Sequence, residues 1–181
     1  MSVCLITNAV EYFNDISESI RAYLGNIEIK RTDSPDDSCE FIVTVMLYRE
    51  NSVAKTTIKK DGIQYLGSGA VLPGNNALER KRYEKRAVKL SVYNAMWSCT
   101  GIRLTWGALT GIRPTRLVCE LLDKGLGIVQ AAEELIKQFD ISPEKAELLG
   151  YDNWASYVIA ENMAKTPIAV DEFLMNLWNA A

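Results

Sequence analysis

The chain has 181 residues and a formal net charge of −3, with apolar residues making up 48% and charged residues 24%. This composition is ordinary for a globular protein. Histidine is absent, which excludes a Ser–His or Cys–His catalytic pair and the commonest metal ligand. The apolar runs are too short to cross a bilayer, and the start of the chain lacks the basic segment of a signal peptide. We therefore expect a cytoplasmic protein without a membrane partner.

Residues 1–76 read as an α+β region. Alternating and β-branched runs predict strands at residues 3–6, 27–31, 41–48, 53–60 and 63–66. Apolar residues three or four positions apart predict a helix over residues 10–24, which Gly25 ends. A loop is expected from Gly67 onward, where the sequence reads GSGAVLPGNN. This order favours a small mixed or antiparallel sheet with one packed helix.

The C-terminal half reads as mostly helical. Helices are predicted at residues 77–99, 114–124, 128–139, from Ser142 onward, and at 153–164 after a break near Gly150. Residues 166–181 form an amphipathic tail. The predicted organisation is therefore an α+β sheet region over 1–76, a helical region over 77–165, and the tail.

The four cysteines, Cys4, Cys39, Cys99 and Cys119, are widely spaced and form no CxxC pair. That spacing offers no local ligand set for zinc or an iron–sulfur cluster. We expect all four to be small, reduced hydrophobic residues and no metal site in this chain.

Positive charge is concentrated in the middle of the chain, where residues 78–125 hold ten Lys or Arg against four Asp or Glu. Arg82, Lys85, Arg86 and Lys89 recur at helical spacing and share one face. That face is either solvated, opposite a stripe of Tyr83 and Leu90, or a platform for carboxylates or phosphates. Nucleic acid is disfavoured as a partner, because the chain is acidic overall and has no recognisable reading motif.

The stretch TWGALTGIRPTRL at residues 105–117 places two arginines at the start of a helix. Pro114 suits the first turn, so Arg113 takes the cap position and Arg116 lies in that turn. Cations are disfavoured there by the helix dipole, at about 0.3–1 kcal/mol each. An anion bound at this end would offset that cost. The anion is either a carboxylate of the protein itself or an external ligand.

The candidate anion-binding residues are Arg103, Arg113, Thr115, Arg116, Arg82, Lys85, Arg86 and Lys89. The motif and turn residues that would position them are Trp106, Gly107, Thr110, Gly111 and Pro114. Trp106 with Gly107 forms a hinge before the turn, and Trp106 is interpreted as core packing rather than as a stacking platform.

The run KRAVKLSVYNAMWSCTGIRLTWGALTGIRPTRLVCELLDKGL resembles a segment of a known family. A basic helix ending in Thr100-Gly101, the motif at 106–117, Gly125 and the ISPEK segment at 141–145 all have counterparts there. The family is the HemZ-type oxygen-independent coproporphyrinogen III dehydrogenases of the radical SAM superfamily, in their N-terminal region. The resemblance covers roughly residues 85–148, and over 1–80 it rests only on the α+β pattern. It implies a role in haem biosynthesis, with a tetrapyrrole-type anion or a radical SAM catalytic domain as partner.

In that family the segment is followed by a barrel whose CxxxCxxC motif binds a [4Fe-4S] cluster and S-adenosylmethionine. No cysteines of this chain have that spacing, so we expect neither cofactor here and no catalytic residue. The expected function is a non-catalytic accessory domain, either part of a longer enzyme or a stand-alone homologue. One alternative is a protein–protein interaction or homo-oligomerisation module acting through the C-terminal tail. A third hypothesis, ranked last, is single-strand RNA binding along the basic helix.

Overall fold

The computed structural model describes residues 2–35, 39–109, 114–143 and 145, and the side chains at 114–116 and 128 lie outside that description. The chain divides into two compact units, Met1–Arg113 and Pro114–Ala181. The predicted boundary between residues 76 and 77 thus falls inside the first unit, because the helix that follows it packs on the sheet. The predicted C-terminal tail, the break near Gly150 and the helix at 153–164 lie outside the described residues.

The described elements confirm the α+β class. In the first unit they are β1 (Ser2–Thr7), η1 (Val10–Tyr12), α1 (Phe13–Leu24), β2 (Glu28–Arg31), β3 (Phe41–Tyr48), β4 (Val53–Lys60), β5 (Ile63–Ala70), α2 (Ala77–Thr100) and η2 (Gly107–Leu109). In the second unit they are α3 (Pro114–Leu122) and α4 (Ile128–Phe139).

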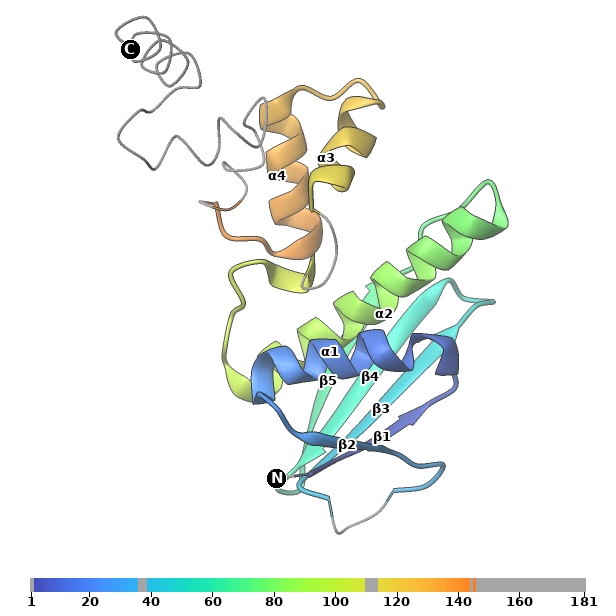
Figure 1. The fold of residues 1–181 in the computed structure, drawn as a ribbon, viewed down its shortest axis with the longest axis vertical. Helices are drawn as coiled ribbons and strands as arrows, with labels where there is room; N and C mark the ends of the chain where they lie inside the picture. The colour runs from blue at the N-terminus through green and yellow to red at the C-terminus, as the bar shows by residue number, and fades with distance from the viewer. Residues whose placement is uncertain (1, 36–38, 110–113, 144, 146–181) are drawn as a thin grey trace, which may run out of the picture. The chain divides into compact units, whose positions relative to one another are not determined.

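The sheet of the first unit is mixed, with strand order β2-β1-β3-β4-β5. Strand β1 pairs in parallel with β2 and β3, and β3, β4 and β5 pair antiparallel. Alternate residues of β3 from Phe41 to Leu47 are buried, as expected for a strand with one face against a core. Helices α1 and α2 both lie across that face (Figure 1). The sequence predicted one packed helix, and the second is α2.

Strand β5 extends to Ala70 instead of ending at Leu66, which corrects the predicted GSG loop. The two glycines lie directly under α2: a Cβ at Gly67 would be 2.1 Å from the Ser91 carbonyl oxygen, and one at Gly69 would be 2.2 Å from that of Ala87. Small α2 residues four positions apart face this strand. Glycine therefore serves here for close helix-to-strand packing rather than for a turn.

A disulfide joins Cys4 to Cys39, which corrects the expectation that all four cysteines are reduced. Cys4 points to the sheet face opposite Val3 and Leu5, because successive side chains of a strand alternate. Cys39 belongs to the connection that leads from β2, at the sheet edge, past β1 to β3. The bond therefore ties this connection to the strand that it crosses. Cys99 and Cys119 are free.

In the second unit, α3 and α4 pack together through apolar residues. The buried side chains are Leu117, Val118, Ala131, Leu135, Phe139 and Ile141. Helix α4 has the predicted bounds and ends at Asp140, which adopts a left-handed conformation with φ 56°. Helix α3 begins at Pro114, as the sequence predicted, and ends two residues before the predicted Lys124.

Candidate functional site

The four residues of the predicted basic face of α2 have different surroundings. The Lys85 Nζ lies 2.6 Å from a carboxylate oxygen of Asp15 in α1. The Arg86 guanidinium lies 5.5 Å from the centre of the Tyr83 ring on the same helix. Arg82 is half-buried, and Lys89 is only 1% exposed. Two of the four residues, Lys85 and Lys89, lie on the side of α2 that faces α1.

The burial of Lys89 contradicts a uniformly solvated face. Tyr83 and Leu90, which the sequence suggested as the core stripe, are half-buried, whereas Ala87, Val88, Ser91 and Val92 are core residues. Helix α2 packs on both the sheet and α1, so its buried surface is wider than one stripe. Lys89 lies within this wider surface.

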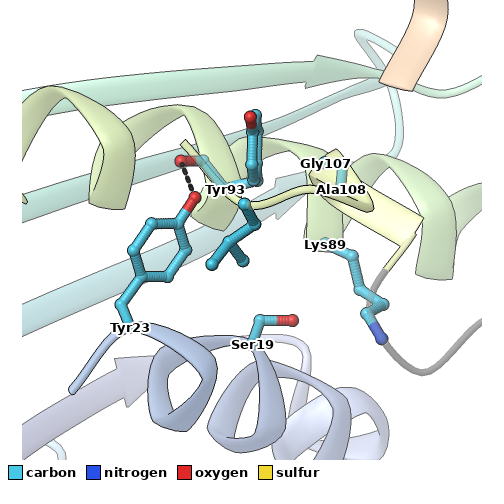
Figure 2. Close-up of a pocket in the computed structure, with 7 residues that line it drawn as sticks. Ser19, Tyr23, Lys89, Tyr93, Gly107 and Ala108 are labelled. Atoms are coloured by element: carbon cyan, nitrogen blue, oxygen red, sulfur yellow. Dashed lines mark hydrogen bonds between the residues drawn. The ribbon is translucent and has the colours of Figure 1, made fainter. Parts of the chain in front are cut away.

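Lys89 lines a small hollow inside the first unit. The other lining residues are Ser19 and Tyr23 from α1, Tyr93 from α2, and Leu104, Gly107 and Ala108 after it. Figure 2 shows the Tyr23 hydroxyl reaching the Tyr93 backbone, where it donates a hydrogen bond of 3.4 Å to the carbonyl oxygen. The volume of about 10 Å³ has room for roughly one water. A tetrapyrrole is far too large to enter.

The hollow brings the two predicted constellations together. Lys89 comes from the basic helix, and Gly107 and Ala108 come from the WGALTGIRPTRL motif. Burial lowers the pKa of the Lys89 ammonium, while Asp15 and Glu18 of α1 oppose that shift and Lys85 adds to it. Lys89 is therefore a buried lysine inside the α1–α2 packing surface, next to the beginning of the motif.

Arg103 and Trp106 lie in the segment after α2. The Arg103 guanidinium lies 5.4 Å from the centre of the Trp97 ring, a cation–π arrangement. Trp106 is half-buried, and Gly107 takes a positive φ of 53°, a backbone conformation that glycine adopts readily. The hinge predicted at Trp106-Gly107 leads into a short helical turn, η2, which begins at Gly107.

Several predicted site residues fall outside what the structure describes. Thr110, Gly111 and Arg113 lie in the segment 110–113, and the side chains of Pro114, Thr115 and Arg116 are likewise outside the description. Their role as an anion site stays a prediction from the sequence.

A polar cluster that sequence reasoning missed joins η1, the turn after β3 and the first half of α2. Arg49, after β3, forms ion pairs with Glu11 and with Glu84. Both carboxylate oxygens of Glu84 lie 3.1 Å from the Arg49 guanidinium. The Tyr12 hydroxyl donates to Glu84 Oε2 at 3.0 Å, and burial together with this carboxylate raises the pKa of Tyr12. Arg49 and Tyr12 lie 35 and 72 positions from Glu84 in the sequence, so no local spacing could reveal the cluster.

No group of three or more His, Cys, Asp or Glu residues able to hold a metal ion occurs in the described residues. Of the two free thiols, Cys119 is exposed and Cys99 is half-buried, and burial raises the pKa of Cys99. Within the same part of the chain, no helix is both long and apolar enough to pass through a membrane.

Comparison with known proteins gives one informative similarity. The chain is 29% identical over 116 residues to the oxygen-independent coproporphyrinogen-III oxidase-like protein HemZ of Bacillus subtilis (strain 168). The matched segment covers 63% of this chain and 23% of that protein. No protein-family model matches the chain, and no solved structure matches it. The similarity supports a HemZ-like relationship for this chain.

Proposed function

We propose that this chain is a non-catalytic accessory domain, or a stand-alone homologue of one, of an oxygen-independent coproporphyrinogen III oxidase-like protein of haem biosynthesis. The observation that carries the proposal is the similarity to HemZ over 116 residues. The motif at residues 106–117, which sequence analysis linked to the N-terminal region of such proteins, supports the position of this domain in the parent protein. The matched segment covers 23% of that relative, and the accessory role is proposed because no cysteines in this sequence have the CxxxCxxC spacing of the family's cluster site.

The anion-binding role is proposed for the arginines rather than for Lys89. Lys89 is buried in a hollow with room for one water, and Lys85 is paired with Asp15. A ligand with several carboxylates needs cations at the surface, and Arg103 is exposed. Arg113 and Arg116, which the sequence predicts at the beginning of α3, are proposed as anion-binding residues as well. The proposed ligand is a tetrapyrrole-type anion such as coproporphyrinogen, or a carboxylate of the catalytic domain on which this domain docks.

The same proposal assigns the [4Fe-4S] cluster and S-adenosylmethionine to the catalytic partner domain rather than to this chain. It also places the protein in the cytoplasm. In that compartment the thiol pool keeps most cysteines reduced, so the Cys4–Cys39 pair would be open in the cell and closed on exposure to oxidant.

Fluorescence titration with coproporphyrin III tests the anion-binding role. The wild-type chain should bind it, and the double variant Arg113→Ala/Arg116→Ala should bind at least about tenfold more weakly, because hydrogen bonds to charged groups contribute about 1.5–3 kcal/mol each. The matched control is Lys55→Ala/Lys59→Ala, which removes two exposed cations from β4 and should leave the affinity unchanged. Absence of wild-type binding, or equal losses in both double variants, would remove tetrapyrrole recognition from the proposal.

A further inference from the structure

Helix α2 ends in a tight turn that hydrogen bonds hold from two sides. Gly101 takes a left-handed conformation with φ 71° and donates its N–H to the Trp97 carbonyl at 2.8 Å. The Thr100 hydroxyl donates to the Met96 carbonyl at 2.8 Å and accepts the Ile102 N–H at 3.2 Å. The chain therefore leaves the helix in a fixed direction.

Trp97, in the last turn of α2, is an exposed ring with buried neighbours. Its side chain is 40% exposed, whereas Tyr93, one turn earlier, is only 2% exposed. The centres of these two rings lie 6.5 Å apart, and Tyr23 of α1 continues the row at 6.1 Å from Tyr93. Aromatic side chains have few rotatable bonds, so a ring supported in this way offers a rigid contact surface.

The residues after the turn add a cation and further apolar surface. The Arg103 guanidinium lies 5.4 Å from the centre of the Trp97 ring, and the Arg103 side chain is exposed. Ile102 is 50% exposed. A cation–π contact orients a guanidinium without neutralising its charge. The end of α2 thus combines an oriented arginine with exposed apolar side chains.

Stabilisation of α2 alone is the simpler explanation for Arg103. A cation of any shape near the C-terminal end of a helix interacts favourably with the helix dipole. That explanation accounts for the charge, but it does not require Trp97 and Ile102 to stay exposed beside it. The same dipole disfavours an anion at this end of the helix, so an anion that binds here depends on Arg103.

We propose that Trp97 positions Arg103 to bind a carboxylate borne on a flat apolar ring system, whose body lies against Trp97 and Ile102. Because this role rests on the proposed function, the ring system is that of a tetrapyrrole, with one propionate on Arg103. A guanidinium pairs with a carboxylate through two parallel hydrogen bonds, and an indole ring favours contact with another aromatic ring. A bare carboxylate would use the arginine and leave the two apolar side chains in water.

Fluorescence titration with coproporphyrin III tests this role. Trp97→Ala should weaken binding at least about fivefold and Arg103→Ala at least about tenfold. Trp97→Phe should stay within about twofold of the wild type, because a phenyl ring still supports the guanidinium. The matched control is Tyr48→Ala, at a 45% exposed ring whose centre lies 5.9 Å from the Lys55 ammonium, and it should leave the affinity unchanged. Circular dichroism confirms that each variant is folded.

Two further measurements separate positioning from a structural role. The loss in Trp97→Ala/Arg103→Ala should be smaller than the sum of the single losses, because Trp97 acts partly through Arg103. Citrate, which has carboxylates but no ring, should displace coproporphyrin III only at a far higher concentration. Strictly additive losses would overturn the positioning role, and efficient displacement by citrate would overturn the contact with a ring.

The variants also distinguish failure of this site from failure of the proposed function. Unchanged affinity in Trp97→Ala and Arg103→Ala, together with a loss in Arg113→Ala/Arg116→Ala, would overturn the role of Trp97 and leave the proposed function standing. Equal losses in Trp97→Ala and Tyr48→Ala would also overturn it, since the ligand would then meet any exposed aromatic side chain. A wild-type chain without affinity for coproporphyrin III would overturn both.

Discussion

Gly67 of β5 lies directly beneath Ser91 of α2, where a Cβ on the glycine would come within 2.1 Å of the serine carbonyl oxygen. The hydroxyl of Ser91 lies 2.8 Å from the hydroxyl of Thr56 on β4, the strand next to β5. The backbone of α2 therefore packs against the strand without side chains between them. The position of α2, and with it the positions of Lys89 and the residues after the helix, depends on this close packing.

Gly67→Ala should destabilise the first unit strongly. The added methyl meets helix backbone, which cannot move aside as a flexible side chain can, and overpacking of this kind typically costs about 1–3 kcal/mol or more. Urea unfolding followed by circular dichroism measures the loss. The matched control is Ser68→Ala, the next residue of the strand, whose side chain is exposed and whose change should stay within about 0.5 kcal/mol. Equal stabilities for the two variants would contradict the close packing.

Tyr12→Phe should lower the free energy of unfolding by about 1–2 kcal/mol, because it removes the hydroxyl of a buried tyrosine that donates to Glu84 and to the Lys81 carbonyl. The loss should shrink in a Glu84→Gln background, since the two residues share one network with Arg49. Denaturant unfolding of the two single variants and the double variant provides the coupling energy. Tyr48→Phe, at an exposed tyrosine, is the control. Strictly additive losses would show that the network is not coupled.

The regular elements of the first unit could be predicted from the sequence because periodicity reports which face of an element is buried. Strands β3 and β4 have the predicted bounds, and α1 follows its apolar spacing after the short η1 turn. The sequence predicted that the strands form a small mixed or antiparallel sheet. Its strand order was not, because nothing local specifies that β1 lies between β2 and β3.

The failures share a cause, which is contact between residues distant in the chain. Glycine in β5 indicates a loop by local rules, and only the approach of α2 explains why it lies in a strand. The helical spacing of Lys89 predicts a place on a basic face of α2, whereas its burial results from the packing of α1 against α2. The Cys4–Cys39 pair has a separation of 35 residues, which no motif encodes. The candidate anion site stays a prediction, because Arg113 and Arg116 lie outside the described side chains.

From the Cys4–Cys39 disulfide we expect a specific number of reactive thiols and a loss of stability on reduction. Unreduced protein in denaturant should show two reactive thiols of the four cysteines, and prior reduction should reveal all four. Closing a loop of this length restricts the unfolded chain, so reduction or Cys39→Ser should lower the free energy of unfolding by about 3–4 kcal/mol. Cys99→Ser, at a free thiol, is the control, and reductant should destabilise it as it does the wild type. Four reactive thiols in the unreduced protein would contradict the bond.

Lys89 makes the stability of the first unit depend on pH in a direction that can be checked. Burial lowers its pKa below the unfolded value of 10.5, despite the opposing influence of Asp15 and Glu18. Between the folded and unfolded pKa values, the unfolded chain binds more protons, so the free energy of unfolding rises with pH. Lys89→Met removes this titration. The stability of the wild type relative to Lys89→Met should therefore increase between pH 7 and pH 10, as measured by urea unfolding.

The same comparison with Lys59→Met separates a buried lysine from an exposed one. Lys59 is exposed on β4, so Lys59→Met should change the stability of the first unit little and is the control for replacing a lysine by methionine. A wild type that loses stability relative to Lys89→Met as the pH rises would mean that the ammonium is stabilised by its carboxylate neighbours more than it is destabilised by burial.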